Sequence, residues 1–282
     1  MITVPSIPAS LLRLPAITAL AIAGWVSSAN AATIAFTSPD YANGALNGQN
    51  NWAAEGSWMV SDAAGAGNAA TSTTNEIALL NSPVVLSTGQ TYGFTINMQL
   101  TGTIAPMAGN TFTYIFQAGL KQNATASGHV LLGDAVTADA TIQYFSNAGA
   151  ANGGDDYRLL NNFSQIGSTI GSGLDAGDLL QFDYTITLGA DAASTSYTAR
   201  LQNLTDATDT GVGNVTGIDS AMFDALTGAG GYLFLQSAGF GANSSGITGV
   251  QVNSVDIAAV PEPSFPALLG LGLIGVLMRR RR

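Results

Sequence analysis

Residues 92–100 read Tyr-Gly-Phe-Thr-Ile-Asn-Met-Gln-Leu, and this stretch decides the fold class. Large apolar residues alternate with small or polar ones, and successive side chains of a β-strand point to opposite faces. The five apolar residues therefore share one face of a predicted strand. A strand with a single apolar face must bury that face against another layer of structure.

The same period of two recurs between residues 32 and 259. Further strands are predicted at 112–120, 180–188, 197–201, 34–36, 58–60, 76–80, 141–145, 157–160, 232–236 and 250–257. The segments between them are rich in Gly, Asn, Ser, Asp and Thr, which is typical of loops. Only Ser220 to Leu226 is predicted to be a helix. The pattern predicts an all-β fold, a two-sheet antiparallel β-sandwich.

The charge balance of this body is strongly acidic. Residues 32–259 carry seventeen acidic side chains and three basic ones, Lys121, Arg158 and Arg200. Nucleic acid and anionic membrane surfaces are therefore excluded as partners, whereas cations, neutral glycans and basic proteins stay open. The 228 residues suffice for one core. Because the chain has no cysteine, disulfides and thiolate metal sites are ruled out.

The C-terminal end has a different character. Val260, Pro261, Glu262, Pro263 and Ser264 precede the apolar run 265–278 and the terminal residues Arg279, Arg280, Arg281 and Arg282. As a helix, the apolar run covers roughly 21 Å, short of the roughly 30 Å hydrocarbon core of a membrane. We therefore expect a transmembrane helix that serves as a transient anchor. The two prolines disfavour helix, so Val260 to Pro263 should stay extended.

This order of motif, apolar helix and arginine cluster resembles the PEP-CTERM sorting domain, which exosortases of Gram-negative bacteria recognise, cut and remove. The resemblance implies an exported protein, anchored in the inner membrane before processing and then delivered to the outer surface or extracellular matrix. It implies an exosortase as partner and a setting of exopolysaccharide and biofilm. The alternative is a plain tail anchor or a buried C-terminal helix, and four terminal arginines have no role in a core.

The N-terminus also predicts export. A start containing Arg13 leads into an apolar stretch over 16–26 and then Ala29-Asn30-Ala31, a secretory signal with an A-x-A cleavage site after Ala31. The Sec translocon and signal peptidase are the implied partners. The predicted organisation is a signal peptide at 1–31, a β-sandwich domain at 32–259 and a sorting signal at 260–282.

Two short segments narrow the fold within the all-β class. Residues 41–52, Tyr-Ala-Asn-Gly-Ala-Leu-Asn-Gly-Gln-Asn-Asn-Trp, and the closing strand 252–257 resemble the ends of concanavalin A-like jelly-roll domains. The resemblance implies a jelly roll and permits carbohydrate binding. Trp52 with Asn50 and Asn51 is the candidate carbohydrate contact, and burial in the core is the alternative for Trp52. Trp58 leads a strand and is predicted to lie in the core.

Signals for catalysis are weak. His129 is the only histidine, and no G-x-S-x-G pattern occurs. Glu55 and Glu76 are the only glutamates of the body, and a glycosidase needs two carboxylates in one cleft. Concanavalin-like glycosidases of the laminarinase type carry E-x-D-x-x-E on one strand, which is absent here. We therefore expect that the protein is not an enzyme.

Aspartates in Gly-rich loops are candidate calcium ligands, since calcium takes several oxygen ligands from carboxylates and carbonyls. The candidates are Asp155, Asp156, Asp175 and Asp178, and the alternative is solvated turn residues. No other cofactor is expected. Two functions stay open: a structural or interaction component of the envelope or matrix, and a lectin-like module that binds exopolysaccharide, with or without calcium.

Overall fold

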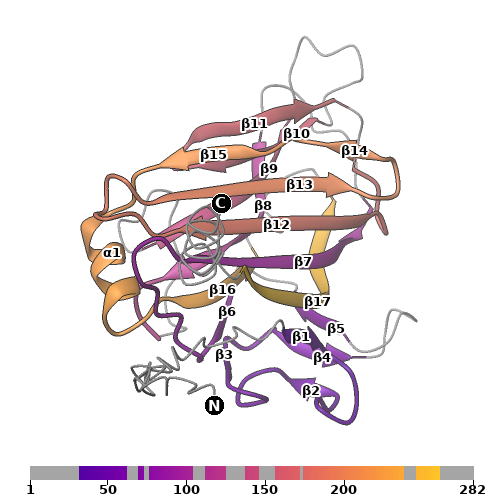
Figure 1. Ribbon diagram of the computed structural model, residues 1–282. Coiled ribbons are helices and arrows are strands. Elements are labelled where there is room, and N and C mark those ends of the chain that lie inside the picture. The colour runs from indigo at the N-terminus through magenta and orange to yellow at the C-terminus, as the bar shows by residue number, and fades with distance from the viewer. Residues whose placement is uncertain are drawn as a thin grey trace, which may run out of the picture.

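The computed structural model describes residues 32–61, 69–72, 76–103, 112–124, 137–145, 156–171, 174–237 and 246–260 (Figure 1). Within these ranges the chain forms seventeen strands and one helix. The strands make two antiparallel sheets, and Figure 1 shows α1 at one end of them. The prediction of an all-β, two-sheet antiparallel sandwich is confirmed.

The larger sheet contains ten strands. Eight follow in the order β14 (Thr208–Asp209), β13 (Ser196–Asn203), β12 (Leu179–Thr187), β7 (Thr91–Gly102), β17 (Ile247–Val260), β5 (Ala69–Ser72), β4 (Met59–Ser61) and β2 (Gly44–Ala45). In addition, β1 (Ala32–Ala35) pairs with β17 and β15 (Gly213–Thr216) pairs with β13. The first and last described strands of the chain are thus neighbours.

The smaller sheet contains seven strands. Their order is β11 (Ser164–Ile170), β10 (Asp156–Asn161), β9 (Thr137–Phe145), β8 (Phe112–Lys121), β16 (Tyr232–Ser237), β6 (Ile77–Leu80) and β3 (Trp52–Ala54). In Figure 1 the strands β12 and β13 of the larger sheet pass in front of β8 and β9.

The alternation in β7 sets which side chains enter the core. Phe94, Ile96 and Met98 are at most 1% exposed, and Thr95 and Asn97 between them are half-buried on the outer face. Burial of each large apolar side chain contributes about 1.5–3 kcal/mol. The strand phase predicted from residues 92–100 is therefore confirmed.

Two tyrosines of the larger sheet cross the core to the smaller one. The hydroxyl of Tyr184 donates to the carbonyl of Ala138 at 2.8 Å, and that of Tyr197 to the carbonyl of Asp139 at 3.0 Å. Burial raises the pKa of both phenols above the ordinary value, because a phenolate would lose its hydration. Both side chains therefore stay neutral and act as donors.

The helix α1 (Ser220–Thr227) lies where it was predicted. Asp219 caps it by accepting from the backbone N–H of Ala221 at 2.8 Å. Met222 and Leu226 are buried and lie against Gly231, where an added Cβ would come within 2.9 Å of both side chains. The helix thus packs closely on the residue that precedes β16.

Several strands were not predicted, and they share a cause. The strands β5, β11 and β15 are rich in Ala, Thr, Ser, Gly and Asn, so no apolar alternation marks them. Hydrogen bonding to a neighbouring strand holds each of them in place, namely β17, β10 and β13. Pairing with a neighbouring strand is not visible in a local apolar pattern.

Candidate functional site

The strand β17 is the last strand of the sandwich, and it ends at Val260, the first residue of the predicted sorting signal. It pairs with β7 along its whole length, and the last pair joins Val260 to Thr91. Val260 thus belongs to the sheet, while Pro261 to Ser264, the apolar run and the four arginines lie outside the described residues. Within the described ranges, no helix has the length and apolar character to cross a membrane.

The predicted start of the mature chain lies beside this strand. Ala32 opens β1 and pairs with Ile257 of β17. The predicted cleavage site, with Ala29 and Ala31, lies outside the described residues. Because the two strands are antiparallel, the N-terminus of β1 and the C-terminus of β17 leave the sheet at the same end.

A groove of about 370 Å³ runs along β1. Such a volume is at the small end of the range for ligand pockets. Besides β1, its lining residues are Asp40, Tyr41, Asn50, Leu80, Ser82 and Ile257. The groove thus combines a carboxylate, an amide and a hydroxyl with aliphatic side chains.

The predicted carbohydrate contact is only partly in this groove. Asn50 lines it, and its side-chain amide donates to the backbone carbonyl of Asp40. Asn50 and Asn51 have φ values of 43° and 67°, a left-handed conformation that asparagine tolerates better than most residues. The backbone carbonyl of Asn51 accepts from Asn81 at 2.7 Å. The two asparagines therefore build the turn before β3.

Trp52 is a core residue, which corrects its assignment as a sugar-stacking ring. It is 2% exposed, and β3 pairs with β6 so that Trp52 lies opposite Leu80. Its ring lies 5.9 Å from that of Phe36, and its indole N–H donates to the hydroxyl of Tyr41 at 3.0 Å. A stacking platform needs an exposed ring face, and Trp52 offers none. Tyr41 is the aromatic residue that lines the groove.

Three of the four candidate calcium ligands lie in the described part of the chain, and they do not form a metal cluster there. Asp155 lies outside the described residues, and Asp156 is buried at the start of β10. The carboxylate of Asp178 accepts from the backbone N–H of Asp175 at 3.0 Å and from the side-chain amide of Asn203 at 2.7 Å. Over the described ranges, no three His, Cys, Asp or Glu side chains are arranged to hold a metal. Calcium binding stays a prediction.

Both glutamates of the body bond to neighbouring backbone. The Glu55 carboxylate accepts from the N–H of Ile77 at 3.0 Å, and the Glu76 carboxylate accepts from the N–H of Ser57. These bonds tie the turn after β3 to the start of β6. Both side chains therefore have a structural role.

A polar cluster that the sequence analysis missed is buried on the outer face of the smaller sheet. Gln117, Lys121, Asp139 and Thr141 are each more than nine-tenths buried. The Asp139 carboxylate accepts from the Gln117 amide at 2.5 Å and from the Thr137 hydroxyl at 2.6 Å. The Thr141 hydroxyl has no hydrogen-bond partner among the described residues, although buried polar groups are normally paired.

The signal for this cluster was present in the sequence. Thr137, Asp139 and Thr141 alternate with Ala138 and Ala140, so the period of two begins four residues before the predicted strand at 141. Because its members bond to one another across β8 and β9, the cluster helps to fix the pairing of these strands. Its role is structural.

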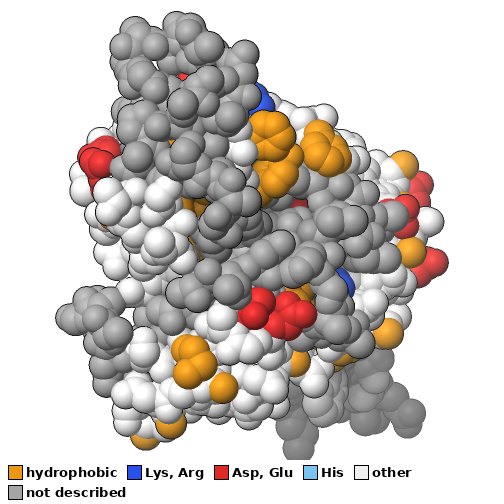
Figure 2. All heavy atoms as spheres, turned by 180° about the vertical axis from the view of Figure 1, so that it is seen from behind, with side chains coloured by type: hydrophobic (Ala, Val, Ile, Leu, Met, Phe, Trp, Pro, Cys, Tyr) orange, Lys and Arg blue, Asp and Glu red, His pale blue; other side chains and the backbone are white. Residues whose placement is uncertain are grey.

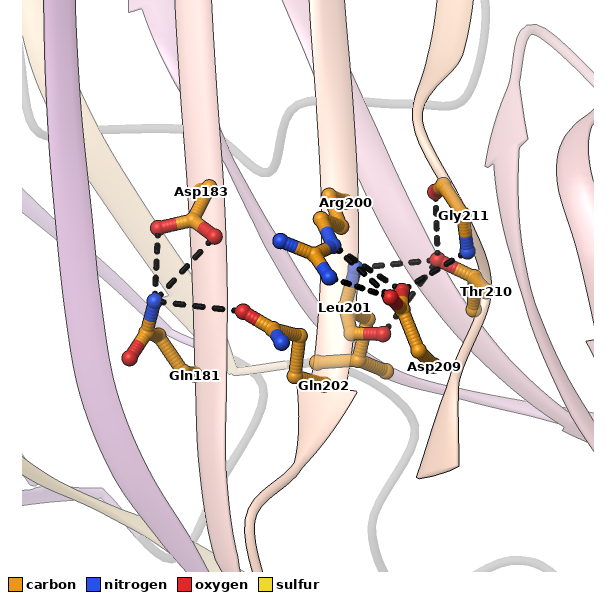
Figure 3. Close-up of polar contacts among 8 residues, drawn as sticks. All are labelled: Gln181, Asp183, Arg200, Leu201, Gln202, Asp209, Thr210 and Gly211. Carbon is orange, nitrogen blue, oxygen red and sulfur yellow. Dashed lines mark hydrogen bonds and ion pairs between the residues drawn. The ribbon is translucent and has the colours of Figure 1, made fainter. Parts of the chain in front are cut away.

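The outer face of the larger sheet is polar and self-paired (Figure 3). The Arg200 guanidinium donates to both oxygens of Asp209 at 3.0 Å and lowers the pKa of that carboxyl. On the same face the Gln181 amide donates to Asp183 at 3.0 Å and to Gln202 at 3.3 Å. Seen from behind, the molecule also shows more acidic than basic side chains (Figure 2). In the views of Figure 2 and Figure 3 the described surface carries more acidic than basic groups.

Comparison with known families concerns the end of the chain. Residues 259–282 match the family described as PEP-CTERM protein-sorting motif. The chain carries a PEP-CTERM sorting motif. This motif implies export, membrane anchoring and processing by an exosortase. The matched range overlaps β17 by two residues, so the PEP-CTERM motif begins inside the last strand.

Comparison with solved structures concerns the body. Lectin II from Ulex europaeus is similar in structure: the match covers 82% of this chain and 99% of the lectin chain, at 12% identity and a TM-score of 0.49. Lectin I-B4 from Griffonia simplicifolia matches 81% over 99%, at 10% identity and a TM-score of 0.48. The carbohydrate recognition domain of Emp47p matches 79% over 96%, at 11% identity and a TM-score of 0.45. No curated protein matches the chain in sequence.

Proposed function

We propose that this chain is an exported β-sandwich that an exosortase releases at the PEP-CTERM motif, and that it then acts as an interaction component of the cell surface or extracellular matrix. The observation that supports this is the position of the motif at the end of β17, the last strand. Removal of the residues beyond Ser264 leaves every described strand in place. A cut in the tail therefore releases the sandwich without breaking its core.

The self-paired outer face suits a component that works outside the cell. Its charged groups are mostly satisfied within the molecule, as Arg200 and Asp209 are. Because the body has three basic and seventeen acidic residues, the released domain should not adhere to anionic membrane surfaces. Both glutamates bond to neighbouring backbone, so we propose binding without catalysis.

Replacement of Pro261, Glu262 and Pro263 by alanine tests the proposed release. The triple variant should stay in the membrane fraction, because alanine lets helix continue through the segment that the peptidase must hold extended. Pro83→Ala, which alters an exposed proline of the body, should be released like the natural protein. Normal release of the triple variant would contradict the proposal.

A second candidate function is carbohydrate binding at the groove along β1. The observation that favours it is the mixed lining of that groove, in which Asp40, Asn50 and Ser82 offer hydrogen bonds beside aliphatic Leu80 and Ile257. Sugars present hydroxyl groups and apolar C–H faces together, and ligand sites typically combine a few polar groups with apolar walls. This candidate function covers binding with calcium and binding without it.

Pull-down on a panel of immobilised neutral polysaccharides, with calcium and with chelator, tests the second function. Asp40→Ala and Asn50→Ala should each weaken retention at least tenfold, because each removes a polar group from the groove. Asp224→Ala and Asn214→Ala change exposed residues elsewhere and serve as matched controls. Retention that is absent in the natural protein, or equal in all variants, would remove the groove as a site.

A further inference from the structure

At the end of β17, β7 is the partner strand that the described residues show. β5 pairs with Val250–Val252 and β1 with Ser254–Ile257, whereas β7 pairs with β17 as far as Val260. In the part of the chain that the structure describes, residues 258–260 have β7 as their single partner strand.

The first pair of this last stretch joins two small residues. Ala258 is exposed and lies opposite Gly93 of β7. Pairs of large or β-branched side chains stabilise neighbouring strands, and a pair of alanine and glycine lacks that contribution. Glycine inside a strand also weakens the strand. The strand end at 258–260 should therefore open more easily than the rest of β17.

The PEP-CTERM motif leaves no linker between this strand end and the tail. The matched range starts at residue 259, and the sheet continues to Val260. A peptidase binds its substrate as an extended segment that pairs with the enzyme, and residues hydrogen-bonded in a sheet are not available for that. Access to the motif therefore competes with the pairing of β17 and β7.

We propose that residues 258–260 form a release segment that must detach from β7 before the exosortase can cut. This inference rests on the proposed processing. The chemistry itself is ordinary hydrolysis: one peptide C–N bond of the tail breaks, water supplies the hydroxyl to the new carboxyl group, and the departing amine takes the proton. When opening is fast relative to cutting, the rate of processing follows the population of the opened strand end.

Pulse labelling of the full-length precursor in cells that contain the exosortase measures this rate. Ala258→Val should slow conversion to the mature form by up to about fivefold, because a β-branched residue strengthens strand pairing. Insertion of six Gly and Ser residues between Val260 and Pro261 should restore fast processing. In that longer chain, Ala258→Val should have no effect. Asn214→Val, at an exposed position of β15, controls for a general gain in sheet stability.

The outcomes distinguish failure of the release segment from failure of the proposed exosortase processing. Processing that is equally fast in the natural chain, Ala258→Val and the linker chain overturns the release segment and leaves exosortase processing in place. Slowing by Asn214→Val as large as that by Ala258→Val also overturns it, because the effect would then be global. If neither the natural chain nor the linker chain is processed, both the release segment and the proposed processing are wrong.

Discussion

Phe94→Ala tests the sandwich core at its centre. Phe94 is 1% exposed, and its ring stacks on Tyr184 with centroids 4.8 Å apart. The rings of Tyr92 and Phe182 follow at 6.3 and 6.4 Å. Removal of a buried phenylalanine ring costs about 3–5 kcal/mol through lost transfer free energy and the cavity left behind. Because this range already includes lost ring stacking, and Phe94 stacks closely on Tyr184, we expect the upper end of it, about 5 kcal/mol.

Urea and thermal unfolding of the mature protein measure this loss. For a domain of about 230 residues, 1 kcal/mol corresponds to roughly 2–4 °C in Tm, so Phe94→Ala should lower Tm by about 10–20 °C. Thr95→Ala is the matched control. It removes only the outer-face hydrogen bond from Thr95 to Asp183, which is 2.7 Å long and contributes about 1 kcal/mol. Equal losses in the two variants would refute the strand phase and the burial of Phe94.

Three further predictions concern single groups. Trp52→Ala should destabilise the fold by about 3–5 kcal/mol in urea unfolding; an unchanged Tm would contradict burial of its ring. Thr141→Val should leave stability unchanged or raise it by about 1 kcal/mol, because the unpaired hydroxyl is replaced by a methyl group, whereas Thr137→Val should lower it by losing the bond to Asp139. Burial raises the pKa of Tyr157 from 10 to about 12. The contribution of this shift to the free energy of unfolding is therefore complete below pH 10 and is lost as pH rises toward 12, at up to about 1.4 kcal/mol per pH unit. Tyr157→Phe should reduce the loss of stability at alkaline pH, and an unchanged dependence of stability on pH would contradict the shift.

Long periodic segments made the fold class predictable. The alternation in residues 92–100 places every second side chain on one face, and only burial between two layers satisfies such a strand. The helix was predictable because Asp219 supplies an N-cap and the apolar residues that follow have helical spacing. The sorting tail was predictable because it is recognised from the order of its prolines, apolar run and arginines alone, without knowledge of tertiary contacts.

Short strands and tertiary burial were not predictable to the same degree. The environment of Trp52 depends on its pairing with Leu80 and on a hydrogen bond from its indole to Tyr41, eleven residues earlier. A strand of three residues is too short for its phase to be read from the pattern. The polar cluster around Asp139 was missed because outward-facing polar residues are expected to meet solvent, and local sequence does not show which outer face is covered.

The intact mass of the protein recovered from the cell surface or the medium tests the central claim most directly. The account predicts a chain that lacks the signal peptide and the residues from Phe265 to Arg282, and that keeps β1 through β17. A surface-exposed protein whose mass still includes Arg279 to Arg282 would contradict it.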